Sequence, residues 1–181
     1  MAKKDFDISV VRPRMVVEDF KFRAQGMPKK KLKNIKKGLQ TLHTLETMAV
    51  NIYKFQITKR ATGHDLQLIV AMGNEMTHLQ DFQVKLYEYD FHPSILRFLY
   101  WLVGFGLGFF SKFMGERAVL KTGVWAEEKA VRHYQRLLKE VEWDDETRKI
   151  IEKNQADEFG HIHRWQTLLK ELEKGDRQFF E

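Results

Sequence analysis

Two four-residue segments, EMTH at residues 75–78 and EFGH at residues 158–161, place a glutamate three residues before a histidine. Residues three apart lie on the same face of a helix, so each pair can offer a carboxylate oxygen and an imidazole nitrogen to one metal ion. Apolar residues at three- and four-residue steps surround both pairs, which predicts that both glutamates point into a core. One such pair alone is more typical of a surface helix, so the repetition carries the signal.

A second glutamate precedes each pair at nearly the same distance. ETMAVNIY at residues 46–53 matches EEKAVRHY at residues 127–134 at Glu, Ala, Val and Tyr. The spacing to the next glutamate of the pattern is 29 residues from Glu46 and 31 residues from Glu127. Glu127 shares its helix face with apolar residues, whereas Glu128 shares a face with charged ones. The sequence therefore predicts an internal duplication of a helix pair.

Four buried carboxylates would each lose several kcal/mol of hydration, so they need compensating positive charge. Two divalent cations supply it, and the predominance of carboxylate ligands favours iron, or manganese as the alternative, over zinc. One glutamate from each of two helices plus Glu-x-x-His from each of two others is the ligand set of ferritin-like di-iron bundles. The expected metal ligands are Glu75 and Glu158 shared by both ions, Glu46 and His78 for one ion, and Glu127 and His161 for the other. Tyr53 and Tyr134 are interpreted either as core residues or as groups that hold ligand carboxylates.

The helical periodicity and the rarity of proline predict an all-α protein, built as a ferritin-like four-helix bundle of two duplicated helix pairs. A chain of 181 residues with 43% hydrophobic residues suits one domain. We expect a bundle over residues 32–175, preceded by a basic irregular arm at residues 1–31. The predicted helices run over Leu32–Lys59, Asp65–Tyr89, Gly115–Glu140 and Asp145–Leu172. Cysteine is absent, which excludes disulfides and thiolate metal sites.

A hydrophobic crossover segment, residues 94–114, is expected to join the two helix pairs. Fourteen residues between Arg97 and Lys112 carry no charge, fewer than the roughly 20 apolar residues that span a bilayer. Its aromatic residues and flanking cations favour peripheral membrane contact, and the alternative is a buried crossover helix. The net charge of +6 and the basic stretch PKKKLKNIKKG would add attraction to an anionic membrane. No nucleic-acid-binding motif accompanies the lysines, so no nucleic acid partner is expected. The amino terminus does not resemble a secretory signal, which predicts a cytoplasmic protein at the inner face of the membrane.

These features together resemble the demethoxyubiquinone hydroxylases of ubiquinone biosynthesis. The resemblance covers about Leu45–Trp165 and includes both Glu-x-x-His pairs, the glutamate before NIYKFQ and the linker GFGLGFFSKFMGERAVLKTGVWAEEKAVRHY. It implies a monooxygenase, a di-iron oxidoreductase that uses O2 as co-substrate to hydroxylate the ring of a membrane-borne polyprenyl quinol. It also implies catalytic roles for Tyr134 and for His133 just before it. The electron donor is unknown from the sequence, and a homo-oligomer is compatible with it.

Two other classes use the same ligand set. A rubrerythrin-like or ferritin-like peroxidase or iron-handling protein would need the six ligands but no apolar surface for a quinol. A membrane or assembly factor without catalysis would keep the site for stability. The reaction products, rather than the ligands, distinguish these classes from the hydroxylase.

Overall fold

The protein is described by a computed structural model that covers residues 16–58 and 63–178. The described residues form helices and no strand, which confirms the all-α prediction. The elements are η1 (Val17–Asp19), α1 (Lys29–Gln56), α2 (Gly63–Glu88), α3 (Arg97–Phe113), α4 (Glu116–Glu140) and α5 (Asp145–Gln178).

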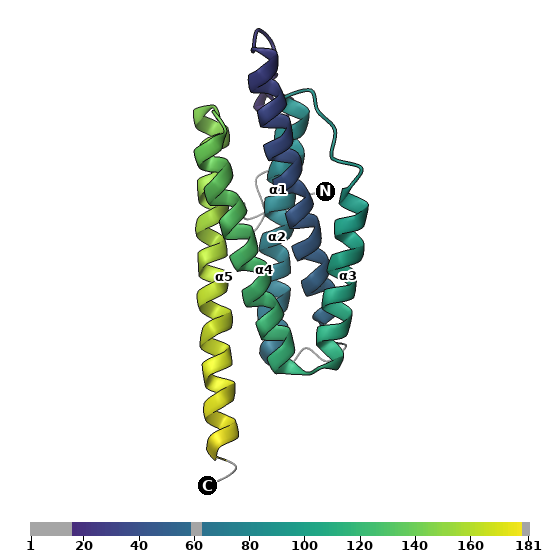
Figure 1. Ribbon diagram of the computed structural model, residues 1–181, viewed down its shortest axis with the longest axis vertical. Helices are drawn as coiled ribbons and strands as arrows, with labels where there is room; N and C mark the ends of the chain where they lie inside the picture. Colours follow the sequence, from purple (N-terminus) through teal and green to yellow (C-terminus); the bar gives the residue numbers. More distant parts are fainter. Residues whose placement is uncertain (1–15, 59–62, 179–181) are drawn as a thin grey trace, which may run out of the picture.

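Four long helices, α1, α2, α4 and α5, lie side by side as a bundle (Figure 1). Within the bundle, α1 packs mainly on α2 and α4 packs mainly on α5, so the two predicted helix pairs exist as packed units. α3 lies outside the bundle against α1 and connects the two pairs. Because of this connection α2 and α4 run in the same direction (Figure 1), as in ferritin-like bundles with one long crossover.

Helix boundaries differ from the predicted ones by three or more residues at three places. α1 begins at Lys29 rather than Leu32, directly after Pro28, whose ring disfavours a helical conformation in the preceding residue. α1 ends at Gln56, and the predicted end at Lys59 lies outside the described residues, as do residues 1–15 of the predicted arm. α5 continues to Gln178, beyond the predicted Leu172. These shifts leave the candidate ligands in helix interiors.

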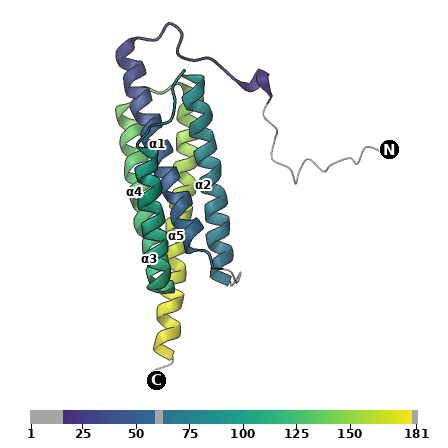
Figure 2. The same cartoon turned by 90° about the vertical axis from the view of Figure 1, so that its right-hand side faces the viewer.

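Arg23 fixes the segment before α1 to one end of the bundle. Its side chain is 12% exposed and makes ion pairs with Glu88 at 2.5 Å, Asp144 at 2.9 Å and Glu146 at 2.6 Å. Lys85 of α2 also pairs with Glu88 and Glu146. The segment therefore crosses the bundle end (Figure 2) and ties the end of α2 to the start of α5. Nothing near Arg23 in the sequence indicates this contact.

α3 approaches the backbone of α1 through two glycines one turn apart. A Cβ atom at Gly104 would lie 2.4 Å from the carbonyl oxygen of Met48, and one at Gly108 would lie 2.4 Å from that of Ile52. The opposite side of α3 exposes large apolar side chains, of which Phe110 is 65% exposed. The crossover is thus a helix packed on one side and open on the other, which differs from a fully buried crossover. None of the described helices has the length and apolarity needed to cross a membrane.

Alanine at Gly104 or Gly108 should separate α3 from α1, because a main-chain carbonyl cannot rotate aside as a side chain can. We expect each substitution to lower the free energy of unfolding by about 1–3 kcal/mol, the usual cost of overpacking. Gly106→Ala is the matched control, since nothing lies within 4 Å of its added Cβ. That change should stabilise α3 by up to about 1 kcal/mol through helix propensity. Urea denaturation measures all three, and equal effects at the three positions would contradict the close approach.

Two apolar clusters enclose the middle of the bundle. One contains Leu39, Phe82 and Tyr134, and the other contains Ile52, Leu120 and Trp165, all almost fully buried. Polar side chains between them are therefore shielded from water on both sides. This is where the predicted ligands lie.

Candidate metal centre

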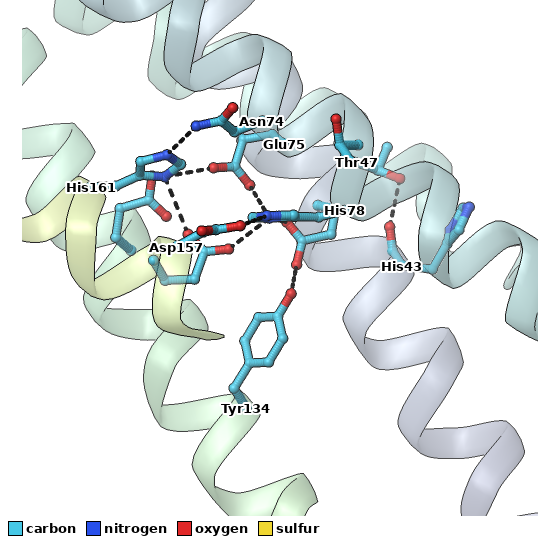
Figure 3. A network of polar contacts seen from close by, with 12 residues as sticks. His43, Thr47, Asn74, Glu75, His78, Tyr134, Asp157 and His161 are labelled. Atoms are coloured by element: carbon cyan, nitrogen blue, oxygen red, sulfur yellow. Dashed lines mark hydrogen bonds and ion pairs between the residues drawn. The ribbon is translucent and has the colours of Figure 1, made fainter. Parts of the chain in front are cut away.

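The six predicted ligands come together in the bundle interior, and each is at most 2% exposed. α1 supplies Glu46, α2 supplies Glu75 and His78, α4 supplies Glu127, and α5 supplies Glu158 and His161. They form two groups, Glu46–Glu75–His78–Glu158 and Glu75–Glu127–Glu158–His161, in each of which one donor atom per residue lies within 4.8 Å of the others. Glu75 and Glu158 belong to both groups (Figure 3 shows Glu75 between the two histidines).

Both histidines present Nδ1 to the carboxylates. His78 Nδ1 lies 3.1 Å from Glu158 Oε1 and 3.5 Å from Glu75 Oε2. His161 Nδ1 lies 2.9 Å from Glu75 Oε1 and 3.5 Å from Glu158 Oε2. Glu46 approaches only the first histidine, at 3.9 Å, and Glu127 only the second, at 3.5 Å. The interior therefore has two similar subsites that share two carboxylates.

The chemistry of this donor set fits two metal ions. Buried donor atoms that make no hydrogen bond within the described residues include both carboxylate oxygens of Glu75, one oxygen each of Glu127 and Glu158, and His161 Nδ1. Buried polar atoms without partners are costly, which favours a ligand that satisfies them together. Donor atoms on opposite sides of one ion lie about twice the 2.0–2.2 Å metal–ligand distance apart. The observed spacing therefore needs only small side-chain movements.

Burial and mutual repulsion control the protonation of these groups. Burial and the charges of Glu158 and Glu75 raise the pKa of both Glu46 and Glu127 well above its ordinary value. Burial alone would lower the pKa of His78, but the close carboxylates of Glu158 and Glu75 raise it to about 12. Burial would likewise lower the pKa of His161, but the close carboxylates of Glu127, Glu158 and Glu75 raise it to about 12. Protons on these four groups thus neutralise the cluster when no cation does.

The two tyrosines pair with ligand glutamates of the opposite half. Tyr53 of α1 donates a hydrogen bond to Glu127 of α4, and Tyr134 of α4 donates one of 2.5 Å to Glu46 of α1. Trp165 Nε1 in turn donates to the hydroxyl of Tyr53 at 3.0 Å. Burial first, and then the adjacent carboxylate, raises the pKa of each tyrosine well above its ordinary value. Of the two interpretations left open by the sequence, these contacts favour tyrosines that hold carboxylates in place.

His133 is not brought into the cluster. It is half-buried on α4, and its Nδ1 accepts a hydrogen bond of 3.0 Å from Arg136. Burial and the charges of Arg136, Lys129 and Arg132 lower its pKa, so the ring is neutral at pH 7. The structure therefore separates His133 from Tyr134, although the two are adjacent in the sequence.

Two residues that sequence reasoning missed contact the outer nitrogens of the histidines (Figure 3). Asp157 Oδ2 lies 3.2 Å from His78 Nε2, and Asn74 Nδ2 lies 3.1 Å from His161 Nε2. Each residue directly precedes a shared glutamate and reaches the histidine of the other half. The only indication of them in the sequence is that each stands directly before Glu75 or Glu158. One partner is a carboxylate and the other is a neutral amide, which makes the two subsites electrostatically different.

Comparison with known proteins assigns the chain to a family. Residues 33–168 match the family model described as ubiquinone biosynthesis protein COQ7. The chain belongs to the COQ7 family. It is 32% identical over 142 residues to the mitochondrial NADPH-dependent 3-demethoxyubiquinone 3-hydroxylase of Dictyostelium discoideum, covering 75% of this chain and 65% of that protein. It is 29% identical over 133 residues to the 3-demethoxyubiquinol 3-hydroxylase of Legionella pneumophila (strain Lens), covering 72% of this chain and 62% of that protein.

The COQ7 match contains all six candidate ligands together with Asn74 and Asp157. It does not contain Arg23, so the contact that fixes the amino-terminal segment lies outside the shared region. The chain spans slightly less than two thirds of the length of these curated COQ7-like relatives.

Replacing Asp157 by alanine should weaken the binding of one of the two metal ions selectively. A carboxylate that accepts the outer N–H of a ligand histidine fixes its orientation and raises its basicity, and its loss costs about 10–100-fold in affinity. We expect the lower end of that range for the ion held by His78, because the Asp157 side chain is 43% exposed and water competes. Asn74→Asp is the reciprocal variant and should increase the affinity for the ion held by His161. Titration with ferrous or manganous ion resolves the two steps, and equal weakening of both ions by Asp157→Ala would contradict the pairing.

Proposed function

We propose that this protein hydroxylates the ring of a membrane-borne polyprenyl quinol, using two iron ions held by the six buried ligands and O2 as co-substrate. The observation that carries the proposal is the pair of subsites with shared glutamates and unsatisfied buried donor atoms. Membership of the COQ7 family and relatives named as hydroxylases of demethoxyubiquinone or demethoxyubiquinol support the substrate class.

The chain's own residues have separable tasks in this proposal. Iron bound by the ligands would supply the redox chemistry that activates O2. Tyr53 and Tyr134 orient Glu127 and Glu46 through their hydrogen bonds. The two apolar clusters exclude water from the reacting centre, which protects an oxidising site from side reactions. His133 lies apart from the ligands, in a hydrogen bond with Arg136 on α4, so this proposal gives it no contact with the metal ions.

The reaction balance requires an external reductant. One atom of O2 enters the ring as a hydroxyl group and the other leaves as water, which consumes two electrons and two protons. The name of the Dictyostelium relative specifies NADPH. An assay of this protein should therefore offer NADPH and NADH separately as the source of electrons.

α3 is proposed to bring the protein to the membrane that contains the quinol. Its outer side exposes Phe98, Leu99 and Phe110, and its inner side packs on α1, the helix that carries Glu46. Only one helix therefore separates the exposed apolar surface from the ligands. An interfacial helix with this surface would dock without crossing the bilayer.

Mass spectrometry of the quinone product with isotopically labelled O2 tests the proposal. Iron-loaded protein, a reductant and a demethoxylated polyprenyl quinol in detergent should yield a product with one labelled oxygen atom. Glu46→Ala and His161→Ala should abolish this product, because each removes a ligand from one ion. Glu128→Ala is the matched control, since Glu128 lies on the outer face of α4 in an ion pair with Arg132.

The competing classes predict other products. A protein that binds two irons, gives no labelled quinone and turns over peroxide rapidly would be a peroxidase and not a hydroxylase. Progressive oxidation and storage of added ferrous ion without a quinone product would indicate an iron-handling protein.

A further inference from the structure

Positive charge predominates in two neighbouring helices, α1 and α3. α1 contains seven lysines, and α3 adds Arg97 and Lys112. The only acidic residue in these two helices is Glu46, which is buried among the metal ligands. By contrast, α5 mixes eight acidic residues with seven basic ones. The surface formed by α1 and α3, which we call the α1/α3 face, is therefore cationic without nearby acidic side chains of its own helices.

A groove of about 430 Å³ lies on this face between the start of α1 and the start of α3. No acidic residue lines it. Its lining comprises Lys33, Lys36, Lys37, Gln40, Thr41, Thr44, Ser94, Leu96 and Tyr100. None of the three lysines makes an ion pair within the described residues, and the Lys36 ammonium lies 5.5 Å from the centre of the Phe91 ring. Three lysines around one hollow that no carboxylate lines favour a compact multivalent anion such as a phosphate group.

The groove opens directly onto apolar surface. Leu96 and Tyr100 line the groove and also belong to the row of exposed residues on α3 that continues through Leu99 and Val103. A ligand that fits both parts carries a phosphate beside hydrocarbon, which is the chemistry of a phospholipid at the membrane surface. A nucleic acid matches the cations but would leave the apolar row exposed to water.

We propose that the groove binds the phosphate of an anionic phospholipid while α3 lies at the boundary between headgroups and acyl chains. This inference rests on the proposed function, which brings α3 to a quinol-containing membrane, and adds the lipid class that the protein selects. Attraction between lysines and anionic lipid would also orient the protein, because the α1/α3 face combines the cations with exposed hydrocarbon.

Sedimentation with vesicles tests the inference on the full-length, metal-loaded chain. Vesicles of phosphatidylcholine alone are compared with vesicles that also contain phosphatidylglycerol. The Lys33→Gln/Lys37→Gln variant should bind the anionic vesicles about 30-fold more weakly, from roughly fivefold per lysine near the surface. Lys149→Gln/Lys153→Gln is the matched control: it makes the same charge change at exposed positions of α5, which does not contact α3, and should bind as the unchanged protein does.

Three results would overturn the inference. Equal binding to both vesicle types would show that the protein does not select anionic lipid. Equal weakening in the two double variants would show that net charge alone acts, without the groove. Inorganic phosphate or RNA is added as a competitor at concentrations that do not disturb binding through the apolar surface of α3. If either one abolishes the preference for anionic vesicles, the groove binds a soluble anion or a nucleic acid instead. Vesicle binding needs neither reductant nor O2, and hydroxylation in detergent needs no vesicle, so failure of this inference and failure of the proposed function are distinguishable.

Discussion

Replacing Glu75 or Glu158 by alanine should reduce the number of bound metal ions from two to none. Each of these carboxylates offers a donor atom to both subsites, so either substitution removes a ligand from both ions at once. By contrast, Glu46→Ala and Glu127→Ala each remove a ligand from one subsite. Each should therefore abolish the binding of one ion and leave the other ion bound. Elemental analysis of protein loaded with iron under anaerobic conditions measures the stoichiometry.

Glu128→Ala provides the control for this series. Its side chain is 45% exposed, one position from Glu127 in the sequence, and it pairs with Arg132 at the helix surface. Two bound ions are expected in this variant. Circular dichroism shows whether each variant stays helical. Loss of both ions in Glu128→Ala, or retention of both in a folded Glu75→Ala, would contradict the assignment of the shared ligands.

Metal affinity should rise steeply with pH. Four groups of the cluster hold protons at neutral pH in metal-free protein, because the pKa of Glu46, Glu127, His78 and His161 is raised in each case. A metal ligand must be deprotonated, so binding releases these protons and is opposed by acid. With up to two protons released per ion, the affinity should increase by more than about tenfold for each unit of pH.

Calorimetry in buffers with different ionisation enthalpies counts the released protons directly. Binding that releases no protons, with an affinity independent of pH between 6 and 8, would show that the carboxylates and imidazoles are not the ligands. The Asp157→Ala variant should keep the same proton count, since Asp157 contacts the outer nitrogen of His78 and is not itself a ligand.

The six residues of the buried carboxylate–histidine cluster were predictable because the sequence pattern that marks them is local and repeated. Helical periodicity alone distinguishes the inward Glu127 from the outward Glu128, and the structure places the former in the core and the latter in a surface ion pair. The same periodicity predicts the helices on which the ligands lie. Helix ends were less predictable: α1 starts three residues early after Pro28, and its end is set by a contact of Thr58 with Asp65 at the start of the next helix.

Contacts between residues distant in sequence were not predictable from one chain. Arg23 meets Asp144 across 121 positions, and nothing near Arg23 in the sequence identifies that partner. The pairing of Asn74 with His161 and of Asp157 with His78 likewise depends on how the two helix pairs pack. The crossover helix combines a packed side and an exposed side, and its composition alone does not reveal which glycines contact α1.

The ion pairs of Arg23 have a consequence for local opening of the bundle. They hold together the last turn of α2 and the first turn of α5, whereas the first turns of α2 expose Leu66, Ile69 and Val70. Amide hydrogens at the end of α2 should therefore exchange with solvent more slowly than those at its beginning, since exchange reports the free energy of local opening. In Arg23→Gln that difference should shrink, because Glu88 would lose one of its two cationic partners and only the Lys85–Glu146 ion pair would still join the two helix ends.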